Sequence, residues 1–393
     1  MPRALESAGS NPADPIKIIR LNQAQNGFRE SLTRLVGHLD LDYFYAQVEE
    51  LENDSLRDHP VLVCVYSGRT EDSGVVSTAN YRARELGVRS GVPIAFAKKR
   101  LSGKGAVFIR MDREKYAGYS ERVMEILRES VDVMEQTGID EAFFDITKRS
   151  GGGFEVASEI ASHVKLEILR REKLTCSVGI APNKVAAKLA SDFKKPDGLT
   201  VIRPSELESF MGPMPVDKLY GIGAKTAKAL QEMDVFTIRD LAKKNISELK
   251  DVFGQKLAVY LHNAASGEDA EPVVERGQAT QISRIITLKA DSRSADEILP
   301  QLVPIMDDVH RRVVEKGRFF KSVSVIGILS DLSIRTRTKT LEAPTNESST
   351  LNHAATELLT SLVGELGELR RVGIKVSDLS ESREQSSLSQ FLR

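Results

Sequence analysis

The first half of the chain alternates between apolar runs and amphipathic stretches that predict strands and helices in turn. Residues 35–41 form an apolar run typical of a buried strand. Phe44, Val48 and Leu51 follow at spacings of four and three, so they share one face of a helix. The next predicted elements are strands at 131–135 and 142–146 joined at Gly138, a helix carrying Ile160, Val164 and Ile168, and a strand at 176–180. With the inserted residues set aside, the order is βαββαβ, the split βαβ arrangement of ferredoxin-like folds.

The second half of the chain repeats this order of elements. The predicted elements are a strand at 281–288, a helix at 294–314, strands at 322–329 and 334–341, a helix at 351–362 and a strand at 372–376. Pro300 and Pro304 are expected to kink or shorten the first helix, because proline removes a helical hydrogen bond. An all-helical stretch at 204–272 lies between the two patterns, and residues 1–34 are predicted to be a poorly ordered extension. The expected fold class is α+β, with several domains.

Length and charge limit the classes of protein to which the chain can belong. With 393 residues the chain is too long to fold around one compact core, so about two to four domains are expected. The net charge is only -1, so a nucleic-acid partner has to be recognised from local patches of charge. Cys64 and Cys176 lie in apolar strand-like runs, which is typical of reduced thiols in a cytoplasmic protein. No segment has the pattern of a signal peptide or a membrane span, and the histidines lack metal-ligand spacing, which predicts a soluble protein without structural zinc.

Acidic residues mark the ends of two predicted strands. Asp40 and Asp42 stand where the first strand passes into its helix, and Asp140 and Glu141 stand at the turn of the strand pair. The first and third strands of a split βαβ sheet are neighbours, so these carboxylates can converge. Magnesium prefers carboxylate oxygens, and a pair of ions about 3.5 to 4 Å apart catalyses nucleotidyl transfer. The predicted catalytic residues and ligands of two Mg²⁺ ions are Asp40, Asp140 and Glu141.

Two observations complicate this prediction. Neighbouring residues of a regular strand face opposite sides, so Asp140 and Glu141 can share a site only if the turn at Gly138 is distorted. Asp42 stands where acids commonly cap a helix, so it is interpreted mainly as an N-cap. Asp40 follows apolar strand residues and has no such structural explanation.

Four sequence blocks carry a resemblance to a known family. The blocks are HLDLDYFYAQVEE at 38–50, SGRTEDSGVVSTANYRAREL at 67–86, GIDEAFFDIT at 138–147 and VGIAPNKVAAKLASDFKKPDG at 178–198. Together they resemble the Y family of translesion DNA polymerases, in particular its polymerase IV-like, archaeal branch. The resemblance implies a low-fidelity enzyme that extends a DNA primer with deoxynucleotides, also past damaged template. The implied right-hand architecture is a ferredoxin-like palm at 35–51 and 111–203, small fingers at 52–110, a helical helix-hairpin-helix thumb at 204–272, a linker at 273–280, a βαββαβ little finger at 281–377 and a tail at 378–393.

The resemblance also assigns roles around the predicted metals. The three acids named above would be the metal ligands, and the carbonyl of Leu41 would add another oxygen. Tyr45 would be the steric gate, whose ring leaves no room for the 2′-hydroxyl of a ribonucleotide. Gly138 stands where relatives often have Ser, and Leu41 where many have Phe. Neither difference removes a metal ligand, so they affect only fine positioning.

Further residues are implied to contact the incoming nucleotide. Thr78, Tyr81 and Arg84 recur at every third position, so they are expected to offer two hydroxyls and a guanidinium group to a triphosphate from one helical face. Lys195 would add an ammonium group at the end of another helix. Without the resemblance, both sets would be interpreted as solvated helix faces. The residues implied to lie near the templating base are Arg69 and Ser77.

Two features are predicted to hold the DNA backbone. Gly221 and Gly223 precede a helix in the pattern of a helix-hairpin-helix turn, whose backbone N–H groups face a phosphate. A row of cations alternates along one strand of the last domain and therefore lines one face of it, namely Arg335, Arg337 and Lys339. The alternatives are a simple tight helical connection and an ordinary solvated sheet face.

The end of the chain resembles a peptide that binds the sliding clamp PCNA, and a disordered polar tail is the alternative. Its anchors would be Gln385, Leu388, Phe391 and Leu392. The predicted partners are primer-template DNA, an incoming deoxynucleoside triphosphate and the clamp, and the chain is expected to be a cytoplasmic monomer. Two rival functions are a palm-type nucleotidyl cyclase, which has no use for a helix-hairpin-helix, and a non-catalytic helix-hairpin-helix DNA-binding protein, which has no reason to keep the three acids together.

Overall fold

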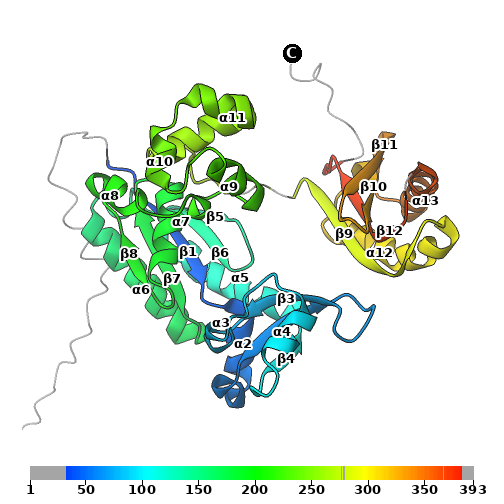
Figure 1. Ribbon diagram of the computed structural model, residues 1–393, viewed down its shortest axis with the longest axis horizontal. Helices are drawn as coiled ribbons and strands as arrows, with labels where there is room; N and C mark the ends of the chain where they lie inside the picture. Colours follow the sequence, from blue (N-terminus) through cyan, green and yellow to red (C-terminus); the bar gives the residue numbers. More distant parts are fainter. Residues whose placement is uncertain (1–31, 276, 278, 366, 383–393) are drawn as a thin grey trace, which may run out of the picture. The chain divides into compact units, whose positions relative to one another are not determined.

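The computed structural model describes residues 32–275, 277, 279–365 and 367–382 (Figure 1). These residues form two compact units. The first unit contains the described residues up to Leu51 and those from Asp112 to residue 275, and the second contains Glu52–Met111 and the described residues from Gly277 onward. Each unit therefore joins segments that are far apart in the sequence. Among the described helices, none is long and apolar enough to cross a membrane.

A five-stranded sheet forms the centre of the first unit, and its strand order is β5-β6-β1-β7-β8. The central strand β1 (Val36–Leu41) is antiparallel to both β6 and β7, and every residue in it is buried. This order confirms that the first and third strands of the βαββαβ pattern are neighbours. The other strands are β5 (Val133–Gln136), β6 (Glu141–Asp145), β7 (Cys176–Ala181) and β8 (Leu199–Val201).

Helix α7 (Lys184–Phe193) lies directly on β1 and β7. The close approach depends on Gly179 of β7, because a Cβ atom there would stand 2.2 Å from the carbonyl oxygen of Ala187 and 2.4 Å from the backbone nitrogen of Ser191. The side chain of Asn183 caps the first turn of the helix. One face of α7 is thereby held over the end of β1. The remaining helices beside this sheet are α2 (Phe44–Glu52), α5 (Arg113–Ser130) and α6 (Phe154–Glu172).

A group of helices follows the sheet within the same unit. Leu230 and Leu261 of these helices share one buried apolar cluster with Val185 of α7, so the group is continuous with the core of the palm-like sheet. Gly254, at φ 74°, interrupts α11, the longest helix of this group. The elements are η2 (Pro204–Glu206), α8 (Leu207–Met211), η3 (Val216–Lys218), α9 (Ala224–Gln231), α10 (Ile238–Lys243) and α11 (Ile246–Ala265).

The segment between α2 and α5 forms a small three-stranded sheet in the second unit, with strand order β3-β2-β4. β2 pairs antiparallel with β3 and parallel with β4, and a compact apolar cluster fills its covered face. The elements are η1 (Asp54–Asp58), β2 (Val61–Tyr66), β3 (Gly74–Ala79), α3 (Tyr81–Glu85), α4 (Ile94–Arg100) and β4 (Val107–Arg110).

The last part of the second unit has the predicted βαββαβ order and an antiparallel sheet in the order β11-β10-β12-β9. The expected shortening of its first helix is wrong, since the helix runs over 21 residues with Pro300 and Pro304 inside it. Both prolines are exposed, and the opposite face buries Ile298, Leu302 and Met306 against the sheet. The elements are β9 (Gln281–Ser292), α12 (Ala295–Glu315), β10 (Phe320–Leu329), β11 (Ile334–Thr345), α13 (Ser348–Glu365) and β12 (Leu369–Ser377).

Candidate active site

The predicted acids meet where β1 ends and β6 begins. Asp40 stands directly opposite Glu141 in the antiparallel register, and the backbone N–H of Leu41 donates to the carbonyl of Asp140 at 2.9 Å. The side chain of Asp40 is only 13% exposed, and that of Glu141 is 25% exposed. Acids about a hundred residues apart in the sequence are therefore adjacent in the sheet.

Asp140 belongs to the turn that precedes β6, so the alternation of a regular strand does not apply to the pair Asp140 and Glu141. Gly138 lies in the same turn, and a Cβ atom there would stand 2.9 Å from the Cγ of Glu141. Burial and the negative charge of Asp40 together raise the pKa of Asp140 to about 6, with burial the larger cause. Asp140 is thus the least neutralised carboxylate of the group.

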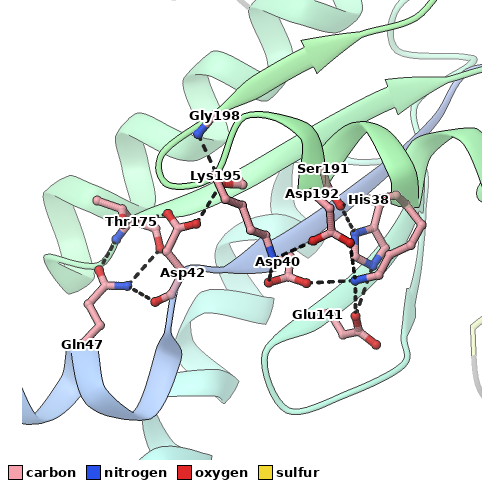
Figure 2. Close-up of polar contacts among 12 residues, drawn as sticks. His38, Asp40, Asp42, Gln47, Glu141, Thr175, Ser191, Asp192, Lys195 and Gly198 are labelled. Atoms are coloured by element: carbon pink, nitrogen blue, oxygen red, sulfur yellow. Dashed lines mark hydrogen bonds and ion pairs between the residues drawn. The ribbon is translucent and has the colours of Figure 1, made fainter. Parts of the chain in front are cut away.

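Two lysines supply positive charge to this edge of the sheet, as Figure 2 shows for Lys195. The Nζ of Lys188 on α7 lies 2.9 Å from Oδ2 of Asp40 and 2.7 Å from Oε2 of Glu141. The Nζ of Lys195 lies 2.6 Å from Oδ1 of Asp40 and 2.9 Å from Oδ1 of Asp192. Burial alone would raise the pKa of Asp40, but both lysine charges outweigh burial and hold that pKa below its ordinary value.

A buried histidine, His38, also contacts the group. The Nδ1 of His38 lies 2.8 Å from Oγ of Ser191, and its Nε2 lies 3.5 Å from Oε2 of Glu141 (Figure 2). The contact with His38 is the main reason that the pKa of Glu141 lies below its ordinary value. Lys188 lowers that pKa as well. Burial lowers the pKa of His38 itself. His38 had no predicted role in the site, and only its place two residues before Asp40 on one strand face could have indicated it.

Asp42 points away from this group, and the interpretation as a helix cap is wrong. Its carboxylate accepts hydrogen bonds from Oγ1 of Thr175 at 2.9 Å, Oγ of Ser177 at 2.8 Å and the backbone nitrogen of Asp197 at 2.8 Å. The side chain is fully buried. Asp42 therefore ties the turn between β1 and α2 to β7 and to the loop after α7 (Figure 2).

The residues present suit hard divalent cations, although their oxygens are engaged by lysine. Within the described part of the chain, no group of three or more His, Cys, Asp or Glu side chains is arranged around a common metal position. Asp40 and Glu141 instead contact Lys188, and the pKa of Asp140 is raised mainly by burial and next by the negative charge of Asp40. Carboxylate oxygens with excess negative charge are the donor set that Mg²⁺ accepts. The chemistry of the site is therefore compatible with metal binding.

Tyr45, the predicted steric gate, lies beside the same group. Its ring stacks on the ring of Tyr116, with centroids 4.3 Å apart and planes 20° apart. The hydroxyl of the fully buried Tyr116 donates to the carboxylate of Glu49 on α2. Burial raises the pKa of Tyr45, and the charge of Asp140 acts in the same direction. The ring of Tyr45 is consequently held in a defined orientation.

The residues predicted to contact the triphosphate do not all share a helix. Thr78 lies in β3 together with Ser77, whereas Tyr81 and Arg84 lie in α3, so the expectation of one helical face is wrong for Thr78. The Nε of Arg84 donates to the carbonyl of Ala79 at 2.8 Å, and its guanidinium lies 4.9 Å from the ring centroid of Tyr81. Arg69, by contrast, pairs with the carboxylate of an aspartate, Asp291, elsewhere in the same unit.

The glycine turn has the geometry expected of a phosphate-binding helix start. Gly221 has φ 83° and is exposed, a backbone conformation that favours glycine. Gly223 is the N-cap of α9 and is also exposed, whereas Ile222 between them is buried. The hydroxyl of Tyr260 donates to the carbonyl of Tyr220 just before the turn. The N–H groups at the start of α9 are therefore open to a ligand.

The cations of β11 share one face, as predicted, and two of them pair with acids of helix α13. Arg337 stands opposite Val325 in the register, and Val325 belongs to the core under α12 and α13. Arg337 pairs with Glu365 of α13. Lys339 likewise stands opposite a buried core valine and contacts Glu357 of α13 at 2.5 Å. These cations are thus partly compensated at the edge of the sheet.

The open face of that sheet carries cations that sequence reasoning missed. On β12, Val372, Ile374 and Val376 are buried in the core, so the alternating Arg371 and Lys375 project to the other face. Lys375 stands opposite the Ser324 of β10. The alternation R-V-G-I-K-V in the sequence already contains this information, but it does not state which face lacks helices.

Comparison with known proteins gives consistent matches along the chain. The sequence model of the impB/mucB/samB family matches residues 39–192, and the model of its C-terminal domain matches 279–389. A third model, described as DNA polymerase-iota, thumb domain, matches residues 217–269. These three matches cover the sheet with the acids, the helical group and the last βαββαβ region.

Full-length relatives and solved structures agree with these matches. DNA polymerase IV of Nitrosopumilus maritimus is 43% identical over 91% of this chain and 99% of its own length. DNA polymerase IV of Methanosarcina acetivorans is 44% identical over 92% of this chain and 100% of its own length. A Y-family DNA polymerase chimera of Dbh and Dpo4 is 36% identical and superposes with a TM-score of 0.82, over 88% of this chain and 100% of that one. An insertion ternary complex of Dbh DNA polymerase is also 36% identical, with a TM-score of 0.65 over the same shares.

Proposed function

This chain belongs to the Y family of DNA polymerases and is a translesion DNA polymerase, and we propose that its reaction takes place at Asp40, Asp140 and Glu141 with two Mg²⁺ ions. The family depends on divalent metal ions. The observation that carries the assignment is the register that sets Asp40 opposite Glu141, with Asp140 in the adjoining turn. The carbonyl of Leu41 is the proposed fourth protein ligand.

Each protein group has a distinct part in this proposal. Two cations held by the acids would activate the primer 3′-hydroxyl and stabilise the leaving oxygen of the triphosphate. Asp40 and Glu141 are oriented in advance by their contacts with Lys188 and His38. Lys195 lies 2.6 Å from Asp40, so its ammonium group is at hand to move from the carboxylate to an incoming phosphate.

The incoming nucleotide is proposed to be a deoxynucleoside triphosphate. Tyr45 would exclude a ribose hydroxyl, because its ring is held rigid by stacking on Tyr116. Thr78, Tyr81 and Arg84 are proposed to bind the triphosphate, although Thr78 does so from a strand. The residues proposed to lie near the templating base remain Arg69 and Ser77.

Primer-template DNA is the proposed macromolecular substrate. An insertion ternary complex is known for the related Dbh polymerase. Backbone N–H groups at Gly221 and Gly223 would contact phosphates, and the open sheet face with Arg371 and Lys375 would follow the backbone without reading sequence. The cations of β11 are expected to contribute less to DNA binding, because Arg337 and Lys339 are already paired with acids of α13. The proposed domains are those expected from the sequence, with the palm at 35–51 and 111–203.

The proposal includes a clamp-binding tail that lies outside the described residues. Gln385, Leu388, Phe391 and Leu392 are the proposed anchors for PCNA, and residues 1–31 of the N-terminal extension also lie outside the described part. The enzyme is proposed to act as a cytoplasmic monomer. The cyclase and the non-catalytic scaffold are disfavoured, because relatives that match nearly the whole chain are polymerases.

Primer extension tests the assignment of the acids. The full-length protein is supplied with primed DNA, Mg²⁺ and the four deoxynucleotides, and Asp140→Ala is compared with Asp145→Ala at the far end of β6. Asp140→Ala is expected to abolish extension while DNA binding is retained, and Asp145→Ala is expected to extend the primer. Extension by the Asp140 variant at the wild-type rate would reject the site.

A further inference from the structure

Lys188 makes a contact that no other described cation of the site makes, because it joins both strands that carry the acids. Its Nζ is within 2.9 Å of Asp40 on β1 and within 2.7 Å of Glu141 on β6. The side chain is 17% exposed, so solvent screens these contacts only partly. Lys195, by comparison, contacts Asp40 but no acid of β6 among the contacts of the described residues.

The position of this ammonium group is built into the fold. Gly179 lets α7 approach the sheet, and the hydroxyl of Ser191 donates to the carbonyl of Lys188 at 2.8 Å. The same hydroxyl is 2.8 Å from Nδ1 of His38, whose Nε2 is 3.5 Å from Oε2 of Glu141. The backbone of Lys188 and the carboxylate of Glu141 are therefore connected through two buried side chains, and the ammonium group is directed at a fixed point between the strands.

We propose that Lys188 is a built-in counter-ion, which holds Asp40 and Glu141 together in the metal-free enzyme and competes with the catalytic metal for their oxygens. The inference rests on the proposed metal role of these acids. Without Lys188, two carboxylates at this partly buried edge would face each other and Asp140 with only Lys195 to offset them. A divalent cation that binds both carboxylates takes the oxygens that the ammonium group occupies.

The competition has a physical consequence for selectivity. A single positive charge is displaced more readily by a doubly charged ion than by a monovalent one, since the Coulomb energy scales with the product of charges. We therefore expect Mg²⁺ or Mn²⁺ to displace the ammonium group of Lys188 from the carboxylates, and Na⁺ or K⁺ to leave it in place. The acids bind metal more weakly with Lys188 present than they would without it. The same contacts keep the carboxylates in position between turnovers.

The test measures Mn²⁺ binding directly, by electron paramagnetic resonance of the free ion, on the full-length protein without DNA. Lys188→Met is expected to tighten the dissociation constant about tenfold, because one adjacent opposite charge changes the affinity of a carboxylate for a cation by about that factor or more. Lys188→Gln is measured as well, and thermal unfolding verifies that both variants fold. Lys194→Met removes an exposed charge nearby and is expected to leave the constant within about twofold, as screened surface charges do.

The outcomes separate this inference from the proposed function. Binding that is unchanged or weaker in both folded Lys188 variants would overturn the role as a competing counter-ion. Asp140→Asn is included as a reference, since it removes a proposed ligand without touching Lys188. If Mn²⁺ binds this reference variant as tightly as the wild type, the metal assignment itself fails, whatever the Lys188 variants do.

Discussion

Replacement of Asp140 by Asn is expected to stabilise the metal-free enzyme while it destroys activity. Burial and the neighbouring Asp40 raise the pKa of Asp140 from 3.8 to about 6 in the folded state. A carboxyl group with a raised pKa retains a proton in the folded chain that the unfolded chain has already released. The free energy of unfolding therefore falls as the pH rises from about 4 to about 6, and it stays lower above that window. Asn carries no charge, so it does not incur this loss.

The magnitude follows from the pKa shift. A shift of about 2 units at about 1.36 kcal/mol each corresponds to roughly 3 kcal/mol, and solvent access to the turn reduces this to roughly 2 to 3 kcal/mol. For a unit of this size, such a difference raises the melting temperature by roughly 5 °C or more. The gain is expected at pH 8 and should nearly vanish at pH 4, where the wild-type carboxyl group is protonated in the folded state.

Differential scanning calorimetry with a chelator present, at pH 8 and at pH 4, measures this difference. A saturating concentration of Mg²⁺ at pH 8 should reverse the order, because only the wild type gains stability from the ion. Asp42→Asn serves as a control, since its carboxylate accepts three hydrogen bonds and its loss should destabilise the protein at pH 8. An Asp140→Asn variant that melts below the wild type at pH 8 without metal would refute the reasoning.

The remaining predictions concern substrate selection, DNA binding and the tail. Tyr45→Ala is expected to admit ribonucleotides, because the ring that stacks on Tyr116 is removed, and the ratio of ribonucleotide to deoxynucleotide insertion measures this; an unchanged ratio would exclude the gate. A double replacement of Arg371 and Lys375 by Ala should weaken DNA binding for all sequences and lower the slope of log affinity against log salt by about 2, whereas equal slopes would exclude contacts from the open sheet face. Deletion of residues 385–393 should remove stimulation by the clamp and leave unassisted extension unchanged, and loss of both would contradict a tail that acts only through the clamp.

Several features could be predicted because they depend on local pattern. The periodicity of apolar residues predicted both βαββαβ regions, and the neighbouring positions of the first and third strands followed from that order alone. Asp40 was singled out because an acid at the end of an apolar strand lacks a local structural use. The structure adds the register that sets it opposite Glu141.

Other features could not be predicted because they depend on which face of an element meets another element. Alternation along β11 showed that its cations share a face, but only the packing of α13 showed that Arg337 and Lys339 pair with acids of that helix. Asp42 looks like a cap in the sequence, yet its partners come from β7 and a loop more than a hundred residues away. Long-range hydrogen bonds of this kind leave no local signal.

The sequence by itself determined the order of strands and helices, the family and the acids at two strand ends, because spacing and residue type are local properties that any fold of this chain must satisfy. Only the tertiary structure decided that Lys188 and His38 enclose Glu141, since α7 reaches β1 through the close contact at Gly179. Charge balance at a site is set by distances between segments, and those distances exist only after the chain has folded.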